Sequence, residues 1–211
     1  MKTLLLLAAL SVTGCSQMTY SPPTVPAKTS NSITIAQPRD AFWPAFTAAL
    51  KAGPYPVKNV DDDKGVINLS YSGDPEKFLD CGEIAGQSYG QASQSPAARA
   101  NQTFQVILTT FSVYTLTRQL SLDSNVDVSV KAIDPQRTTV AVNTGYVLNR
   151  KTALKVDEYE IRGVADSIAF NGDGAGVFEK VFPDDEPPTC RSRGVMEKEI
   201  LAIAERAGLE P

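Results

Sequence analysis

The chain has 211 residues and a formal net charge of −4, with 42% hydrophobic residues, 21% charged residues and no histidine. A mildly acidic chain without a basic tract lacks the electrostatic footprint of a nucleic-acid-binding protein, so we expect no nucleic-acid partner. The absence of histidine excludes a Ser-His-Asp triad and a Cys-His pair. The sequence also contains neither a GxSxG nor a phosphate-binding loop signature.

The first residues have the pattern of an export signal. Met1 and Lys2 form a short positive start, residues 4–10 are apolar and uncharged, and small residues precede Cys15. The apolar run is too short for a membrane-spanning helix, which needs about 20 apolar residues. We expect residues 1–14 to be a signal peptide. This signal is either of the lipoprotein type, cleaved before a lipid-bearing Cys15, or an ordinary signal peptide that a cysteine follows by chance.

The residues at the cleavage point favour lipidation. Val12, Thr13, Gly14 and Cys15 resemble the lipobox of bacterial lipoproteins, in which a branched apolar residue and small residues precede an invariant cysteine. The resemblance implies that Cys15 carries diacylglycerol and palmitate-type chains, which anchor the protein on a membrane. Ser16 stands where an inner-membrane retention signal has Asp. By the same resemblance, we expect an outer-membrane location with the domain facing the periplasm.

The two other cysteines, Cys81 and Cys190, form an even pair in an exported chain, which predicts a disulfide. It would close a loop of about 110 residues, worth roughly 4–5 kcal/mol on the chain-entropy model. The alternatives are two unrelated thiols or a metal pair. We expect no metal and no cofactor apart from the covalent lipid, because histidine and CxxC spacing are absent.

A tether and an amphipathic helix follow the signal. Residues 16–32 are rich in Ser, Thr, Pro and Asn, so we expect residues 15–32 to be a flexible lipidated tether. The pattern over 38–52 predicts a helix, with Phe42, Trp43 and Phe46 on one apolar stripe. This stripe is either the core face of the helix or the wall of an apolar ligand pocket.

The rest of the chain is predicted to contain further strands, a long loop and a final helix. Residues 57–60 and 66–71 are typical of two strands joined by a polar turn. Residues 85–102 lack an apolar period and predict a long mobile loop. Alternating residues over 103–148 predict an antiparallel meander with a turn at 134–137. Weaker strands are expected at 155–162, 167–170 and 176–182, and a final helix at 195–207.

Two acidic segments raise the question of a cation site. The run Asp61-Asp62-Asp63 has carboxylates, but consecutive side chains point apart, whereas a hard cation needs ligands converging from several directions. Asn171 and Asp173 lack the later carboxylate of an EF-hand loop. Plain turns are the favoured interpretation of both.

A second resemblance begins at Pro38. Pro38, a helix containing Trp43, a strand at 57–60, an acidic turn ending in Gly65 and a strand at 66–71 occur in this order. The order is similar to the repeated domain of the BamC (NlpB) lipoprotein family of the outer-membrane β-barrel assembly machinery. The resemblance implies an α+β, helix-grip-like fold, with an antiparallel sheet packed on an N-terminal and a C-terminal helix. The cysteine pair and the 85–102 segment lie outside that pattern.

Together these observations predict a single α+β domain over 33–211, behind a signal and a tether. We expect a non-catalytic envelope lipoprotein that binds other envelope proteins in an outer-membrane assembly or secretion complex. The alternative is a periplasm-facing carrier of a lipid or other apolar ligand, with a pocket at Phe42, Trp43 and Phe46. An envelope hydrolase with two facing carboxylates is a third class.

Overall fold

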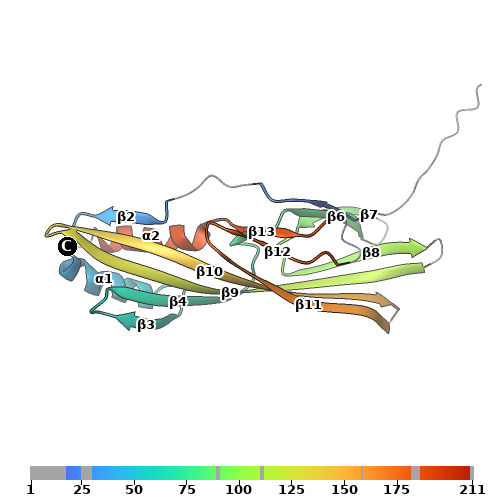
Figure 1. Ribbon diagram of the computed structural model, residues 1–211, viewed down its shortest axis with the longest axis horizontal. Helices are drawn as coiled ribbons and strands as arrows, with labels where there is room; N and C mark the ends of the chain where they lie inside the picture. The colour runs from blue at the N-terminus through green and yellow to red at the C-terminus, as the bar shows by residue number, and fades with distance from the viewer. Residues whose placement is uncertain are drawn as a thin grey trace, which may run out of the picture.

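The computed structural model describes residues 18–24, 30–88, 91–109, 112–157, 159–181 and 186–209. Within these ranges the elements are β1 (Thr19–Ser21), β2 (Ser32–Ile35), α1 (Arg39–Lys51), β3 (Val57–Asp61), β4 (Val66–Gly73), β5 (Leu79–Asp80), β6 (Glu83–Ser88), β7 (Gln91–Pro96), β8 (Asn101–Thr109), β9 (Ser112–Asp134), β10 (Arg137–Val156), β11 (Tyr159–Asn171), β12 (Ala175–Val177), β13 (Thr189–Ser192) and α2 (Val195–Ala207). Figure 1 shows an elongated molecule with both helices in one half.

The long antiparallel hairpin of β9 and β10 is the spine of the sheet. These strands have 23 and 20 residues, and they pair from the turn at Asp134 and Arg137 as far as Thr115 and Lys155. Along β10, buried and more exposed residues alternate, so one face of the hairpin packs on the core. In the turn, Asp134 accepts hydrogen bonds from the Gln136 amide and the Arg137 guanidinium. The predicted meander and its turn at 134–137 are therefore confirmed.

Each long strand has two partners on its outer side, one after the other. On β9, β8 pairs with the first part and β4 with residues 122–129. On β10, β2 pairs with residues 138–141 and β11 with residues 145–156. The outer strands complete the sheet, because β3 pairs with β4, and β6 carries β7, β1 and a short bridge to β8. The hairpin thus joins a half that lies under the helices to a half built from strands alone (Figure 1).

The helices pack on each other and on the first of these halves, where α1 contacts β9 and α2 contacts β10 and β2. Phe42, Phe46 and Leu50 form the buried face of α1. Met196 and Ile200 belong to the buried face of α2. The predicted helix at 195–207 is confirmed at both ends, and the one predicted at 38–52 spans Arg39–Lys51.

The predicted fold class is wrong. Strands hold 57% of the chain and helices 15%, so the molecule is mostly β and is not an α+β helix-grip domain packed on an N-terminal and a C-terminal helix. The reason is the length of the sheet: a helix of 13 residues is about 20 Å long, whereas a strand of 23 residues is about 70 Å long. Helices of this size can cover only part of such a sheet.

The predicted loop at 85–102 is also wrong. Its residues form most of the β6–β7 hairpin, a turn and the start of β8. The small side chains that gave the segment its loop-like composition pack closely instead. Ala97 and Ala98 are 3% and 1% exposed, and a Cβ on Gly86 would lie 3.1 Å from a ring carbon of Phe104.

The prediction of a flexible tether over 15–32 is wrong for those of its residues that the structure places in the sheet. Met18 is 6% exposed, and Thr19–Ser21 pair with β6. Ser32–Ile35 pair with β10. Residues 19–21 and 32–35 are therefore paired into the sheet. No helix among the described residues is long and apolar enough to cross a membrane.

Candidate functional site

The predicted site residues have separate structural positions. Cys15, the expected lipid site, lies outside the described residues. Cys81 and Cys190 form the predicted disulfide across a separation of 109 residues. It joins the segment after β5 to β13, and β13 also pairs with β5 and with β12 in a small second sheet. Both cysteines are buried, so this bond fixes the start of α2 to the end of the β3–β5 segment.

The aromatic stripe of α1 belongs to the hydrophobic core. Phe42 and Phe46 are fully buried, and their rings stack with centroids 5.0 Å apart. Trp43 is 9% exposed, and its indole Nε1 donates to Asp62 Oδ1 at 2.7 Å. The two pockets described below are lined by other residues. All three rings therefore pack in the core, which agrees with the interpretation of the stripe as the core face of the helix.

A polar pocket of about 940 Å³ lies where β10, the β11–β12 turn and the start of α2 meet. Its lining is rich in amide and charged side chains: Asn31, Asn125, Asp127, Asn143, Asn171, Asp173, Arg191, Arg193, Glu197 and Lys198. The three cations balance the three carboxylates. Such a lining suits a polar ligand with both donors and acceptors, as in a peptide backbone, better than an ion of one sign.

The pocket opens at a gap along one edge of β10. The ladder with β2 ends at Ala141, and the ladder with β11 begins at Gly145. Two backbone hydrogen bonds close the ends of the gap, from the Val142 amide to Asn31 O at 2.8 Å and from the Gly172 amide to Thr144 O at 2.9 Å. The pocket therefore lies between two strands that share one edge.

Three buried polar side chains support the floor of the pocket. The Ser192 hydroxyl donates to Tyr146 Oη at 3.0 Å, and Tyr146 Oη lies 3.4 Å from both carboxylate oxygens of Glu197. Burial, together with the Glu197 charge, raises the pKa of Tyr146, so the phenol stays protonated and donates to the carboxylate. Neither hydroxyl is activated as a nucleophile by this arrangement.

Two glycines allow the backbone to approach this floor. A Cβ on Gly172 would lie 2.6 Å from Glu197 Oε1, closer than a carbon and an oxygen can pack. Gly194, which precedes α2, has φ of 66°, in the left-handed region that favours glycine. Its amide donates to Ser192 Oγ at 2.9 Å. The glycines therefore let the β11–β12 turn and the start of α2 close around the network.

A second, shallower pocket lies beside the end of α1. Its lining includes Tyr55, Lys77 and Glu199, with Tyr71 and Phe78 stacked edge to face. Lys77 Nζ lies 2.6 Å from Glu199 Oε1, and the Tyr55 hydroxyl donates to the other carboxylate oxygen. Desolvation acts to raise the pKa of Glu199, but the hydrogen bonds from Lys77 and Tyr55 outweigh it and the pKa is lowered. This site is an ion pair with a phenol donor, in which Glu199 is stabilised as the carboxylate.

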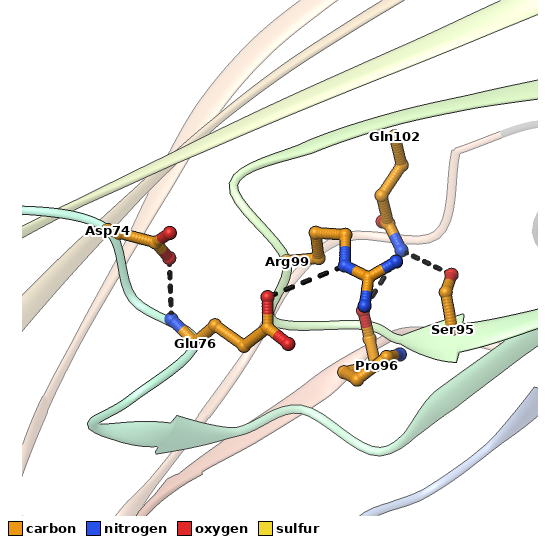
Figure 2. Close-up of polar contacts among 6 residues, drawn as sticks. All are labelled: Asp74, Glu76, Ser95, Pro96, Arg99 and Gln102. Atoms are coloured by element: carbon orange, nitrogen blue, oxygen red, sulfur yellow. Dashed lines mark hydrogen bonds and ion pairs between the residues drawn. The ribbon is translucent and has the colours of Figure 1, made fainter.

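The turn between β7 and β8 carries a third group of polar contacts. Figure 2 shows the Arg99 guanidinium turned toward Glu76, with Arg99 Nε 3.4 Å from Glu76 Oε2. The Gln102 amide nitrogen donates to Ser95 Oγ at 2.8 Å and to the Pro96 carbonyl at 2.9 Å. These bonds hold the β7–β8 turn and connect it with the segment after β4, which is a structural role.

The acidic segments serve as turns. Asp61 Oδ1 accepts from the Lys64 amide, and Asp62 Oδ1 accepts from Trp43, so these carboxylates stabilise the β3–β4 hairpin. In the part of the chain that the structure describes, no group of three Cys, Asp or Glu side chains is arranged to hold a metal ion.

The polar network around Tyr146 was not predicted from the sequence. Glu197 is a charged residue, yet it is 6% exposed. One signal was present: Leu201 lies one helical turn after Glu197 and is also buried, so the apolar face of α2 extends to this side. Tyr146 and Ser192 lie in strands whose pairing across the chain no local pattern reveals.

Comparisons with known proteins find no relative. No protein-family model matches the chain, no curated protein matches it, and no solved structure matches it.

Proposed function

We propose that the chain is an exported lipoprotein, anchored through lipid on Cys15 at the periplasmic side of the outer membrane. In this proposal it acts without catalysis, by binding other envelope proteins in an assembly or secretion complex. The lipobox-like residues support the anchor, and the disulfide between Cys81 and Cys190 fits a chain that folds in an oxidising compartment outside the cytoplasm.

The observation that carries the interaction part of the proposal is the open edge of β11. This strand has 13 residues and pairs with β10 on one side. Within the described ranges no strand pairs with its other side. An unpaired edge is a template on which an extended segment of a partner can add as a further strand, through main-chain hydrogen bonds.

The chemistry along this edge favours a selected partner. Glu160 and Arg162 place charges on β11, which discourages unselective pairing between edges. At its end the strand leads into the polar pocket, where the Asn171 and Asn143 amides offer donors and acceptors. A partner strand added to β11 would be able to place its terminal residues in that pocket, which provides specificity beyond the main-chain bonds.

The apolar-carrier alternative has less support. Phe42 and Phe46, its proposed pocket residues, are fully buried against each other in the core. The pocket beside the β11–β12 turn has ten amide or charged residues in its lining, and Phe42, Trp43 and Phe46 do not line it.

The pairing pattern shows which backbone groups of β11 can form hydrogen bonds with an added partner strand. Because the Gly172 amide bonds to Thr144, the even-numbered residues from Arg162 to Phe170 form the hydrogen-bonded pairs with β10. The odd-numbered residues between them point their backbone groups outward. Ser167 is such a residue. Ser167→Pro would remove one outward donor while keeping the β10 ladder, as Pro is tolerated at a strand edge.

The test is an affinity pull-down of tagged full-length protein from crosslinked membranes. We compare the wild type, Cys15→Ser, Ser167→Pro and the control Ser167→Ala. We expect one envelope complex to be enriched with the wild type and with Ser167→Ala, and to be lost with Ser167→Pro. Equal recovery of the same proteins with Ser167→Pro would contradict binding at this edge. Equal recovery with Cys15→Ser would contradict the need for the anchor.

A further inference from the structure

The half of the molecule without helices ends in two long hairpins. The first joins β8 to β9, and the second joins β10 to β11. Figure 1 shows both hairpin ends on the side farthest from α1 and α2. The opposite end holds the β9–β10 turn and the helices.

The hairpin ends expose large apolar side chains. Val113, near the start of β9, is 51% exposed, and Tyr159 and Ile161, at the start of β11, are 76% and 52% exposed. Tyrosine with aliphatic neighbours is the combination that settles at a membrane–water interface, where the ring has an apolar body and a polar tip. The nearby charges on Lys155, Asp157, Glu160 and Arg162 are of both signs, so no electrostatic preference for an anionic surface follows.

Exposure alone does not choose between the two ends of the molecule. The helix end also exposes apolar side chains, since Ile133 is 49% and Leu209 is 83% exposed. The choice comes from the position of the anchor.

Cys15 lies three residues before Met18, which is 6% exposed and fixed in the fold. An extended chain covers at most about 3.6 Å per residue, so the anchored residue lies within about 11 Å of Met18. β1, which follows directly, pairs with β6, and Figure 1 places β6 in the half that carries the hairpin ends. A lipid on Cys15 therefore holds this half at the bilayer.

We propose that the ends of the β8–β9 and β10–β11 hairpins form a second, non-covalent contact with the bilayer, made by Val113, Tyr159 and Ile161. This inference rests on the proposed lipid anchor at Cys15. The two attachments orient the molecule. Because β9 is about 70 Å long, the helix end stands well beyond the headgroup region, and the open edge of β11 leads from the membrane toward the polar pocket.

Two isoleucines of similar exposure provide a matched test. Ile161→Cys places a single reactive thiol at the hairpin end, and Ile133→Cys places one at the helix end. Cys81 and Cys190 are bonded and buried, and Cys15 carries lipid, so an environment-sensitive fluorophore labels only the new cysteine. The lipidated full-length proteins are bound to phosphatidylcholine vesicles that contain a fraction of nitroxide-labelled lipid.

We expect the probe at position 161 to shift to shorter wavelength and to be quenched at least twofold more than the probe at position 133. If Ile161→Cys fails to fold, Tyr159→Cys serves at the same hairpin end. Equal quenching at both ends, or stronger quenching at position 133, overturns the inference. Flotation of the same samples separates the two proposals. If the protein floats with the vesicles but the probe at position 161 is not quenched, the hairpin contact is contradicted and the anchor proposal is not. If the protein does not float, or if the Cys15→Ser variant floats equally well, the anchor proposal is contradicted.

Discussion

Arg150 of β10 lies opposite Asp166 of β11 in the strand register, and the two side chains form a two-point ion pair. Arg150 Nε is 2.9 Å from Asp166 Oδ1, and Nη2 is 2.6 Å from Oδ2. Nη2 also donates to the Glu179 carbonyl, and the guanidinium lies 4.3 Å from the ring centroid of Phe178. A single buried guanidinium therefore connects β10, β11 and the segment after β12.

Replacing this arginine tests the connection. Arg150 is 1% exposed and Asp166 is 24% exposed. We expect Arg150→Leu to lower the free energy of unfolding by about 2–3 kcal/mol, because the Asp166 carboxylate and the Glu179 carbonyl lose a buried donor. Chemical denaturation measures the change. Arg137→Leu is the control, since its pair with Asp134 is exposed and is worth about 0–1 kcal/mol. Equal losses in the two variants would contradict the role of burial.

The buried phenol at the pocket floor makes a second prediction. Tyr146→Phe leaves Ser192 without its acceptor and Glu197 without its donor, and both groups are buried. We expect a loss of about 1–3 kcal/mol in the free energy of unfolding, against less than about 0.5 kcal/mol for Tyr159→Phe at an exposed site.

A double-mutant cycle separates this network from general packing. Tyr146→Phe and Glu197→Leu each remove one partner of the same contact, so their combined loss should be smaller than the sum of the separate losses. Strict additivity in thermal or chemical unfolding would show that the two side chains do not interact.

The disulfide predicts a large dependence on oxidation. With a sequence separation of 109 between Cys81 and Cys190, the bond restricts the unfolded chain strongly. On the chain-entropy model its loss costs about 4–5 kcal/mol, so the double variant Cys81→Ala/Cys190→Ala should unfold at much lower denaturant concentration. Adding a reductant to the wild type should give the same shift and leave the variant unchanged. A shift below about 1 kcal/mol would contradict this contribution.

Local pattern was sufficient for the elements in which burial follows the strand or helix period. The α2 boundaries, the turn at Asp134 and the alternation along β10 are of this kind. The β6–β7 hairpin was missed because small side chains carry no apolar period. In the turn after this hairpin, Ala97 and Ala98 are buried although they too carry no such period. In physical terms, composition reports the hydrophobicity of a segment and is silent on how closely its backbone can approach a neighbour.

The site depends on contacts between distant parts of the chain. Tyr146 and Glu197 are 51 residues apart, and Asn31 meets Asn143 across 112 residues. Such contacts follow from strand register, which a helix or strand pattern does not determine. The helix-grip expectation failed for a related reason, because the order of short elements near Pro38 contains no information on the length of the β9–β10 hairpin that follows.

The ion pair between Glu199 of α2 and Lys77 predicts a pH dependence of stability. The pKa of Glu199 is lowered from its ordinary value of 4.5 in the folded protein, mainly by Lys77 and Tyr55 acting against partial burial. A carboxyl whose folded pKa lies below its unfolded pKa contributes stability that is fully present above the unfolded value. That stability is lost as the pH falls through the folded value. The loss should therefore develop below about pH 4.5 and be absent between pH 6 and 8.

Glu199→Gln removes this titration. Since the Glu199 side chain is 35% exposed, we expect the pair to contribute about 0.5–1 kcal/mol at neutral pH. The free energy of unfolding of the wild type should approach that of the variant as the pH is lowered from 6 to 3. Glu205→Gln, an exposed change of the same charge on the same helix, is the control and should follow the wild type over this range. A constant difference between wild type and Glu199→Gln at every pH would mean that the variant alters packing and that the carboxylate charge does not contribute.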